Sequence, residues 1–236
     1  MRSTLFEDFD NRAQEVRRYF IFLKNLEKGS IQLSLGNANN PKIKPINEDL
    51  EKTLKATGYL LLYNLVESTM RNAIVTIFDE LKTQRVSFDD VRDEIKKIVI
   101  DNLKDKDNKS TKDILVTVQN ISVDIISATF NRDRLFSGNI DGKRIKDTAK
   151  MYGFSYTTNA RKTGNGSNLE KIKNHRKDLA HGFKSFEEIG KDATADELFK
   201  IQKRVICYLR EILENIEMYI SNQEYLQRNE QNSENN

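Results

Sequence analysis

The sequence predicts an all-α fold, and three observations support this prediction. Only two prolines and ten glycines interrupt the 236 residues, and both prolines, Pro41 and Pro45, fall in one loop. Long stretches are therefore free to form helix. Apolar residues recur every three or four positions through most of the chain, and no internal repeat is visible. A chain of this length fits one domain, with or without a long insertion, and can bury a sizeable core.

The first half of the chain predicts three helices. The first runs over about Ser3–Glu27, because its apolar residues fall on one helical face. Gly29–Pro45 is rich in turn-forming residues and is predicted to be a loop. About Asn47–Lys82 is predicted to be a long helix, central to the core, because apolar residues occur along its whole length. Ser87 is the expected N-cap of a third helix.

The second half begins with an ambiguous segment. A charged loop is predicted over Asp105–Lys112, and the β-branched stretch Ile114–Phe130 follows it. This stretch keeps a helical period over about four turns, too long for a typical strand, so we predict helix. Arg132–Asp141 is a predicted connector, Gly142–Tyr152 a short basic helix, and Thr157–Asn168 a polar loop.

The last two predicted helices carry the clearest signals. One begins near Asn168 and stops at Gly182, since glycine adopts the positive φ that ends many helices. In the other, apolar residues from Leu198 to Tyr219 step by three and four. The stretch 223–236 is rich in Asn, Gln and Glu. We therefore predict a single domain over residues 1–222 and a disordered polar tail over 223–236.

Composition excludes several classes of protein. The one cysteine, Cys207, excludes an internal disulfide framework and suits a reducing compartment. Two histidines and one cysteine argue against a structural zinc site. No apolar run approaches the ~18 residues that span a bilayer, and the first residues do not read as a signal peptide. We expect a cytoplasmic protein without a metal, a cofactor or a membrane association.

Positive charge is concentrated in one part of the chain. The net charge is only +3, but Lys143–Lys184 holds eleven basic and three acidic residues, which leaves the remainder at −5. A localised basic patch indicates a polyanion site, and the alternative is chance clustering on a solvated surface. The residues expected to bind the phosphates of such a polyanion are Lys143, Arg144, Lys146, Lys150, Arg161, Lys162, Lys173 and Lys184.

Arg176 and His181 form the best candidate catalytic pair in this basic stretch. Arginine stays protonated and forks onto phosphate oxygens, while histidine exchanges protons near neutral pH. On an ideal helix, five steps place these two residues about 140° apart. They can converge only if the helix ends or bends between them, or if a second subunit supplies half of the site. If the helix continues straight, the two residues have no joint catalytic role: Arg176 is solvated, and His181 is a helix-terminal residue.

Five further residues are possible supporting groups. Glu67 and Arg71 are one helical turn apart on the long helix, where an ion pair could be structural or catalytic. The others adjoin the candidate pair in sequence: His175, Lys177 and Asp178.

The segment Arg176–Gly182 resembles the Arg-x4-6-His signature of the HEPN superfamily. Leu62–Ser68, and Leu135–Asp141 with the later Tyr152-Gly153, resemble the branch named MAE-type HEPN, so the resemblance covers roughly residues 45–220. It implies a HEPN-like helical bundle that dimerises so that two Arg–His pairs face one cleft. Active members of the superfamily are metal-independent endoribonucleases, often toxins or abortive-infection effectors.

The expected function is therefore RNA cleavage by attack of the ribose 2′-OH, within a prokaryotic defence or toxin–antitoxin-type system. His181 is the expected acid or base, and Arg176 the group that stabilises the phosphorane. The expected partners are RNA, a second copy of the chain, and a neutralising antitoxin or a defence-complex protein. One toxin branch carries a modifiable Tyr two residues after the His, and Phe183 stands there. The alternative is a non-catalytic RNA-binding or protein-interaction HEPN module within a defence or restriction complex.

Overall fold

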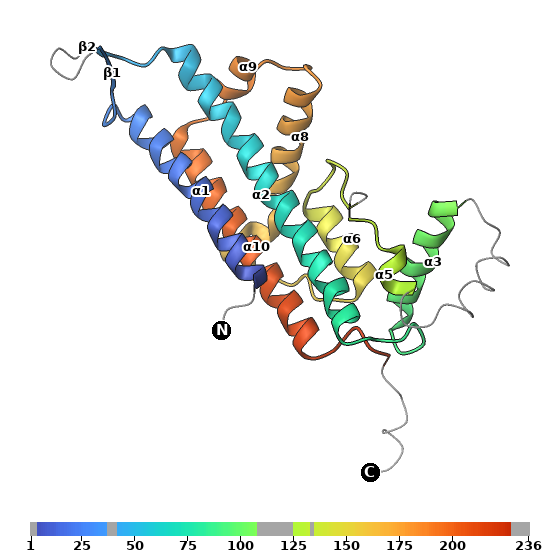
Figure 1. Cartoon of the computed structure of the whole chain (residues 1–236). Coiled ribbons are helices and arrows are strands. Elements are labelled where there is room, and N and C mark those ends of the chain that lie inside the picture. The colour runs from blue at the N-terminus through green and yellow to red at the C-terminus, as the bar shows by residue number, and fades with distance from the viewer. Residues whose placement is uncertain (1–3, 37–41, 108–124, 133–134, 228–236) are drawn as a thin grey trace. The chain divides into compact units, whose positions relative to one another are not determined.

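The computed structural model describes residues 4–36, 42–107, 125–132 and 135–227, and it confirms the all-α prediction (Figure 1). Apart from helices it contains one short antiparallel hairpin, in which Leu33 lies opposite Lys44. The elements are α1 (Thr4–Glu27), β1 (Leu33–Leu35), β2 (Lys42–Lys44), α2 (Glu48–Thr83), α3 (Asp93–Asp107), α5 (Ile125–Thr129), α6 (Gly142–Tyr152), α7 (Ala160–Thr163), the 3-10 turn η2 (Gly164–Gly166), α8 (Asn168–Ala180), α9 (Phe186–Gly190) and α10 (Ala195–Ser221).

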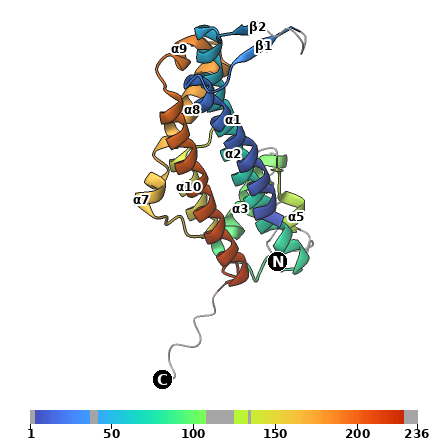
Figure 2. The ribbon, with the colours of Figure 1, turned by 90° about the vertical axis from the view of Figure 1, so that its left-hand side faces the viewer.

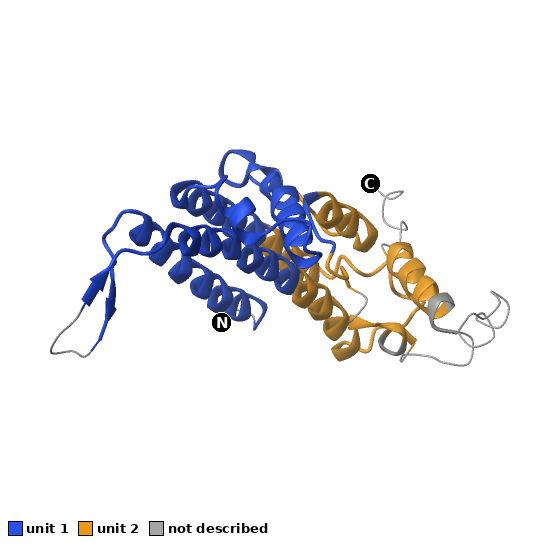
Figure 3. Cartoon of the chain, turned by 90° about the horizontal axis from the view of Figure 1, so that it is seen from above, with its two compact units in different colours: residues 1–69, 139–142, 158–211 blue, residues 70–138, 143–157, 212–236 orange. Residues whose placement is uncertain are grey.

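The chain forms two compact units, coloured separately in Figure 3. Unit 1 comprises residues 1–69, 139–142 and 158–211, and unit 2 comprises residues 70–138, 143–157 and 212–236. The sequence predicted one domain. The long helices α2 and α10 each contribute to both units, so neither unit is a separate stretch of chain.

The core of unit 1 is built on α1 and the first halves of α2 and α10 (Figure 2). Phe20, Leu62 and Leu209 are fully buried there. The hydroxyl of Tyr19 donates a 2.6 Å hydrogen bond to the carbonyl of Leu54, which ties α1 to α2. Burial of these apolar faces, as the periodicity predicted, supplies the main driving force for the helix packing.

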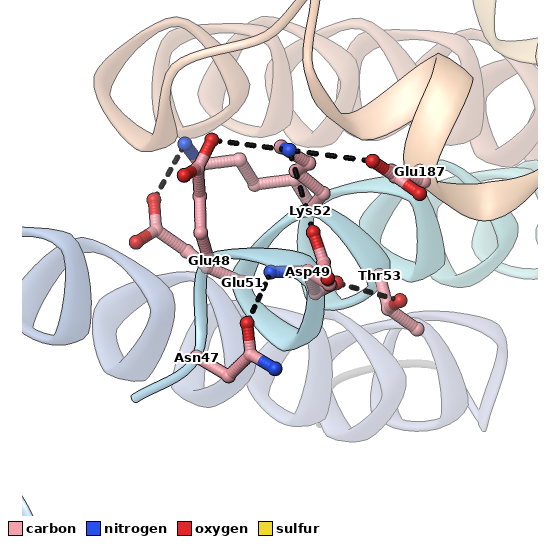
Figure 4. A network of polar contacts seen from close by, with 8 residues as sticks. Asn47, Glu48, Asp49, Glu51, Lys52, Thr53 and Glu187 are labelled. Carbon is pink, nitrogen blue, oxygen red and sulfur yellow. Dashed lines mark hydrogen bonds and ion pairs between the residues drawn. The ribbon is translucent and has the colours of Figure 1, made fainter. Parts of the chain in front are cut away.

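Helix α9 lies directly against the start of α2. A Cβ at Gly190 would approach the carbonyl oxygen of Lys52 to 1.9 Å, so only glycine permits this contact. The Lys52 ammonium lies 3.0 Å from Glu48, 3.5 Å from Asp49 and 3.4 Å from Glu187 of α9 (Figure 4). Since α8 leads into α9, this contact helps to fix α8 beside α2.

Unit 2 packs the second half of α2 with α3, α5, α6 and the end of α10. The rings of Phe78 and Phe130 stack at 4.0 Å. The hydroxyl of Tyr219 donates a 2.7 Å hydrogen bond to the carbonyl of Tyr152 at the end of α6. The helix predicted over Gly142–Tyr152 is confirmed, with Ile145 and Ala149 on its buried face.

Several short elements differ from the predictions. The predicted loop Gly29–Pro45 contains the hairpin, and the predicted loop Thr157–Asn168 contains α7 and η2. Helix α7 forms because the Asn159 side chain accepts a hydrogen bond from the Lys162 amide at its start. Helix α3 continues to Asp107, into the predicted charged loop. Of the helix predicted over Ile114–Phe130, Ile125–Thr129 is helical, and residues 114–124 lie outside the described residues.

The predicted start of the polar tail was wrong, because the chain packs as far as Gln227. Tyr225 is fully buried, and its carbonyl accepts a 2.9 Å hydrogen bond from the Arg92 amide. Leu226 forms a bridge with Val91, and the Gln227 amide donates to the Asp90 carbonyl at 2.8 Å. One tyrosine therefore anchors a segment whose composition is polar. Residues 228–236 lie outside the described residues.

Removing this segment is expected to destabilise the protein. Deletion of all residues after Asn222 should lower the melting temperature by roughly 5–10 °C, because losing a buried aromatic ring costs about 3 kcal/mol. Deletion of the residues after Gln227 is the matched control and should leave the melting temperature unchanged. Equal melting curves for the two truncations would show that Tyr225 contributes nothing to the stability of the fold.

Candidate active site

Helix α8 carries Arg176 and ends immediately before His181. The His181 amide still donates to the Lys177 carbonyl at 3.1 Å, so the helical hydrogen bonding continues past Arg176 without interruption. Gly182 then adopts a φ of +68°. The Gly182 amide donates to Leu179 at 3.3 Å and the Phe183 amide to Asp178 at 2.9 Å, which is the pattern of a Schellman cap. The predicted role of Gly182 as the helix terminator is confirmed.

Arg176 and His181 lie in different surroundings at the end of α8. Five steps of an ideal helix separate them by about 140° around the axis, and α8 ends at Ala180, with His181 as its C-cap. The Arg176 guanidinium lies 5.1 Å from the ring centroid of Tyr63 on α2. His181 is exposed, with its ring 5.6 Å from that of Phe183.

The Arg176 guanidinium packs on the ring of Tyr63, and this contact is called the seat of Arg176 below. Tyr63 is buried, and its hydroxyl accepts a 3.3 Å hydrogen bond from the Ile140 amide. Burial is the main reason that the pKa of Tyr63 is raised to about 12, and a hydrogen bond to Glu67 also favours the neutral phenol. Glu67, a predicted supporting residue, therefore contacts the hydroxyl of the same tyrosine on whose ring Arg176 packs. A neutral ring with a fixed hydroxyl offers its π face to the cation.

Arg71, the other predicted residue on α2, serves a different contact. Its guanidinium donates a 3.0 Å hydrogen bond to the carbonyl of Arg132, and both residues belong to unit 2. This contact ties α2 to the segment after α5, which is a structural role.

His175 packs against α2 one turn before Tyr63. Its ring centroid lies 4.4 Å from that of Tyr59, and its Nδ1 is buried without a hydrogen-bond partner among the described residues. Burial is the main cause that lowers the pKa of His175, and the charges of Lys171 and Lys184 add to this effect. A neutral, half-buried imidazole of this kind is a packing residue rather than one presented to a substrate.

The predicted basic residues differ in how far their charge is available. Lys173 forms an ion pair with Asp141, and both side chains are largely buried. Lys184 lies 3.2 Å from Asp178, a pair that spans the turn at Gly182. The exposed residues of the set are Lys143, Arg144, Lys146 and Lys150 in unit 2, and Arg161, Lys162 and Lys184 in unit 1, with Lys177 also exposed on α8. The Lys146 ammonium lies 5.0 Å from the ring centroid of Tyr156.

The described residues form neither a metal-binding cluster nor a membrane-spanning helix. Within the part of the chain that the structure describes, no three His, Cys, Asp or Glu side chains lie close enough to hold a metal ion. Among the same residues, no helix combines the length and the apolar character that crossing a membrane needs.

Comparison with known families gives a match over residues 1–225 to the family described as MAE_28990-like HEPN. The chain belongs to this family. Neither the curated proteins nor the solved structures provide a significant match. The predicted MAE-type branch is thus confirmed, and the match extends to α1, which the sequence resemblance did not include. Membership of the HEPN family points to a nuclease or another RNA-related module.

The seat of the HEPN motif arginine is the feature that sequence reasoning missed. Tyr63 and Asp141 lie in the stretches that resemble the MAE-type branch, but the sequence predicted no contact for either of them, and Tyr59 was not singled out. The available signal was spacing, since Tyr59 and Tyr63 are four residues apart and therefore present two rings on one face of α2. Those rings meet the consecutive residues His175 and Arg176.

The environment of His175 predicts a pH-dependent stability in this HEPN domain. Its folded pKa lies below the ordinary value of 6.5, so the unfolded chain binds more protons in the window just below that value. Stability should therefore fall as the pH drops below 6.5. We expect the loss of melting temperature between about pH 7.5 and about pH 5.5 to be smaller in His175→Gln than in the wild type. Identical losses would assign the effect to other groups.

Proposed function

We propose that this HEPN chain is a metal-independent endoribonuclease of a prokaryotic defence or toxin–antitoxin-type system. The observation that carries the proposal is the arrangement of the motif on α8. Arg176 is held on Tyr63 at 5.1 Å, while His181 is presented at the exposed helix end. An oriented guanidinium and an accessible imidazole are the two groups that phosphodiester transesterification uses.

Each group has a defined task in the proposed reaction. A base removes the proton of the ribose 2′-OH, which attacks the adjacent phosphorus and expels the 5′-oxygen of the next nucleotide. The expelled oxygen takes up a proton, and His181 acts as the base or as the acid. Arg176 donates to the non-bridging oxygens, where negative charge develops. Exposed cations such as Lys177 hold the backbone without reading bases.

The geometry further supports a homodimeric active unit. Arg176 and His181 are separated by about 140° around an ideal helix, and a two-fold axis can bring His181 of one protomer to Arg176 of its partner.

Mixing two inactive variants tests this assembly. Arg176→Ala and His181→Ala are each expected to be inactive. After unfolding and refolding together, about half of the dimers are mixed, and one of their two composite sites is intact, so about a quarter of the wild-type activity should return. Size-exclusion chromatography with light scattering verifies that dimers have formed. An inactive mixture of verified dimers would place both residues of each site in one chain.

A cleavage assay with RNA and DNA substrates tests the proposed function. An RNA oligonucleotide incubated with the protein in excess EDTA should be cleaved, because no step uses a metal ion. DNA of the same sequence should survive, since it lacks the 2′-OH nucleophile. Cleavage of both polymers, or of neither under any ionic condition, would contradict the proposal.

One observation favours a second candidate function. The His181 imidazole has no hydrogen-bond partner among the described residues, whereas catalytic histidines are usually oriented by one. A non-catalytic HEPN module that binds RNA or a defence-complex partner needs no oriented imidazole. Retention of intact RNA by the wild-type protein, with no cleavage products over hours, would favour this function.

A further inference from the structure

Phe183 is the most exposed of the large hydrophobic side chains that the structure describes. Its exposed fraction is 69%, and its ring centroid lies 5.6 Å from that of His181, with the ring planes inclined at 35°. The Phe183 amide is fixed by its 2.9 Å hydrogen bond to the Asp178 carbonyl. An aromatic ring is therefore held in solvent, on an ordered turn, beside the proposed acid/base residue.

We infer that Phe183 is a base-stacking subsite for an unpaired nucleobase next to the scissile phosphate. This inference rests on the proposed function and defines its substrate as single-stranded or loop RNA. Bases in a duplex already stack on their neighbours, so only an unpaired base can turn onto an exposed ring. Stacking on phenylalanine is available to every base, and the subsite therefore selects strand state rather than sequence.

The charges around the ring favour a nucleic acid over a protein partner. From Lys171 to Lys184 the sequence holds five basic residues and one acidic residue, Asp178; among them Lys173 is paired with Asp141 and Lys184 with Asp178. Lys184 comes directly after Phe183, and Lys177 is exposed on the last turn of α8. A ring flanked by cations suits a base that is attached to a phosphate backbone, whereas an apolar protein surface gains nothing from these charges.

The chain offers a direct reporter for this contact because it contains no tryptophan. Phe183→Trp introduces a single indole at the proposed subsite. In the His181→Ala background, where RNA stays intact, single-stranded RNA should quench the tryptophan emission. An oligomer with the same phosphates but abasic sugars should not. Phe22→Trp, at a position of α1 that is 38% exposed, is the matched control and should not respond to either oligomer.

Affinity measurements complete the test. In the same background, Phe183→Ala should weaken binding of single-stranded RNA by roughly 5- to 150-fold, the usual range for the loss of one stacked base. Phe183→Tyr should retain the affinity, and Phe183→Leu should not, because stacking needs a ring rather than apolar volume.

The outcomes separate this inference from the proposed function. Cleavage by the wild type without quenching of the Phe183→Trp protein would overturn the subsite alone. Quenching without any cleavage by the wild type would support the subsite and overturn the nuclease. If Phe183→Ala binds RNA like its parent but dissociates the dimer, the ring belongs to a protein interface and the inference is wrong.

Discussion

His181→Ala is expected to lower the rate of RNA cleavage by about two to four orders of magnitude, the usual contribution of a positioned acid or base. The variant should fold normally, because His181 is exposed at the end of α8 and its described contacts are the backbone cap and the Phe183 ring. Initial rates on a fluorescent RNA and a thermal melt measure both effects. A loss of activity together with an unchanged melting temperature identifies a chemical role.

The other histidine of the chain, His175, provides a matched control. His175 packs on Tyr59 and is kept neutral by its burial, so it has no expected part in proton transfer. His175→Gln should change cleavage by less than about tenfold at neutral pH, well below the effect of an acid/base residue. A reversed pattern, in which His175 matters and His181 does not, would move the acid/base role to the face of α8 that packs on α2.

Arg176→Lys is expected to lower cleavage by about two to three orders of magnitude, although the charge is retained. The ammonium of lysine lacks the planar fork that donates to two phosphate oxygens at once. Loss of one donor to a developing oxyanion typically costs this much. Rates under saturating RNA distinguish this loss from weaker binding, since the effect should lie in kcat.

A neighbouring cation is the control for charge alone. Lys177 is exposed on the same helix and is expected only to hold the RNA backbone. Lys177→Ala should raise KM in a salt-dependent manner and leave kcat close to the wild-type value. Wild-type activity in Arg176→Lys would show that Arg176 has no catalytic role and that its charge only packs on Tyr63.

The long helices of this protein could be predicted from the sequence because their signal is local. The period of apolar residues placed α1, α2 and α10 to within a few residues, the bounds of α6 were predicted, and Gly182 marked the end of α8. The predicted N-cap Ser87 was wrong, because α3 begins at Asp93. The motif itself was also visible in the sequence. What a local pattern cannot give is the partner of each side chain, because that depends on which distant segments meet.

Three features of the structure illustrate this limit. Lys173 was predicted to bind phosphate, but it pairs with Asp141, 32 positions earlier in the chain. Tyr225 lies in a segment of polar composition, yet its burial and the backbone pairing with Arg92 outweigh that composition. The seat of Arg176 on Tyr63 joins α8 to α2. In each case the contact is set by packing, which no short stretch of sequence records.

Mapping the ends of the RNA products tests the central claim most directly. Attack by the 2′-OH leaves a 2′,3′-cyclic phosphate on one fragment and a 5′-hydroxyl on the other. Mass spectrometry of products formed in EDTA by the wild-type protein should show these two ends, and the His181→Ala preparation should not produce them. Products with 3′-hydroxyl and 5′-phosphate ends, or cleavage that EDTA abolishes, would contradict the chemistry assigned to Arg176 and His181.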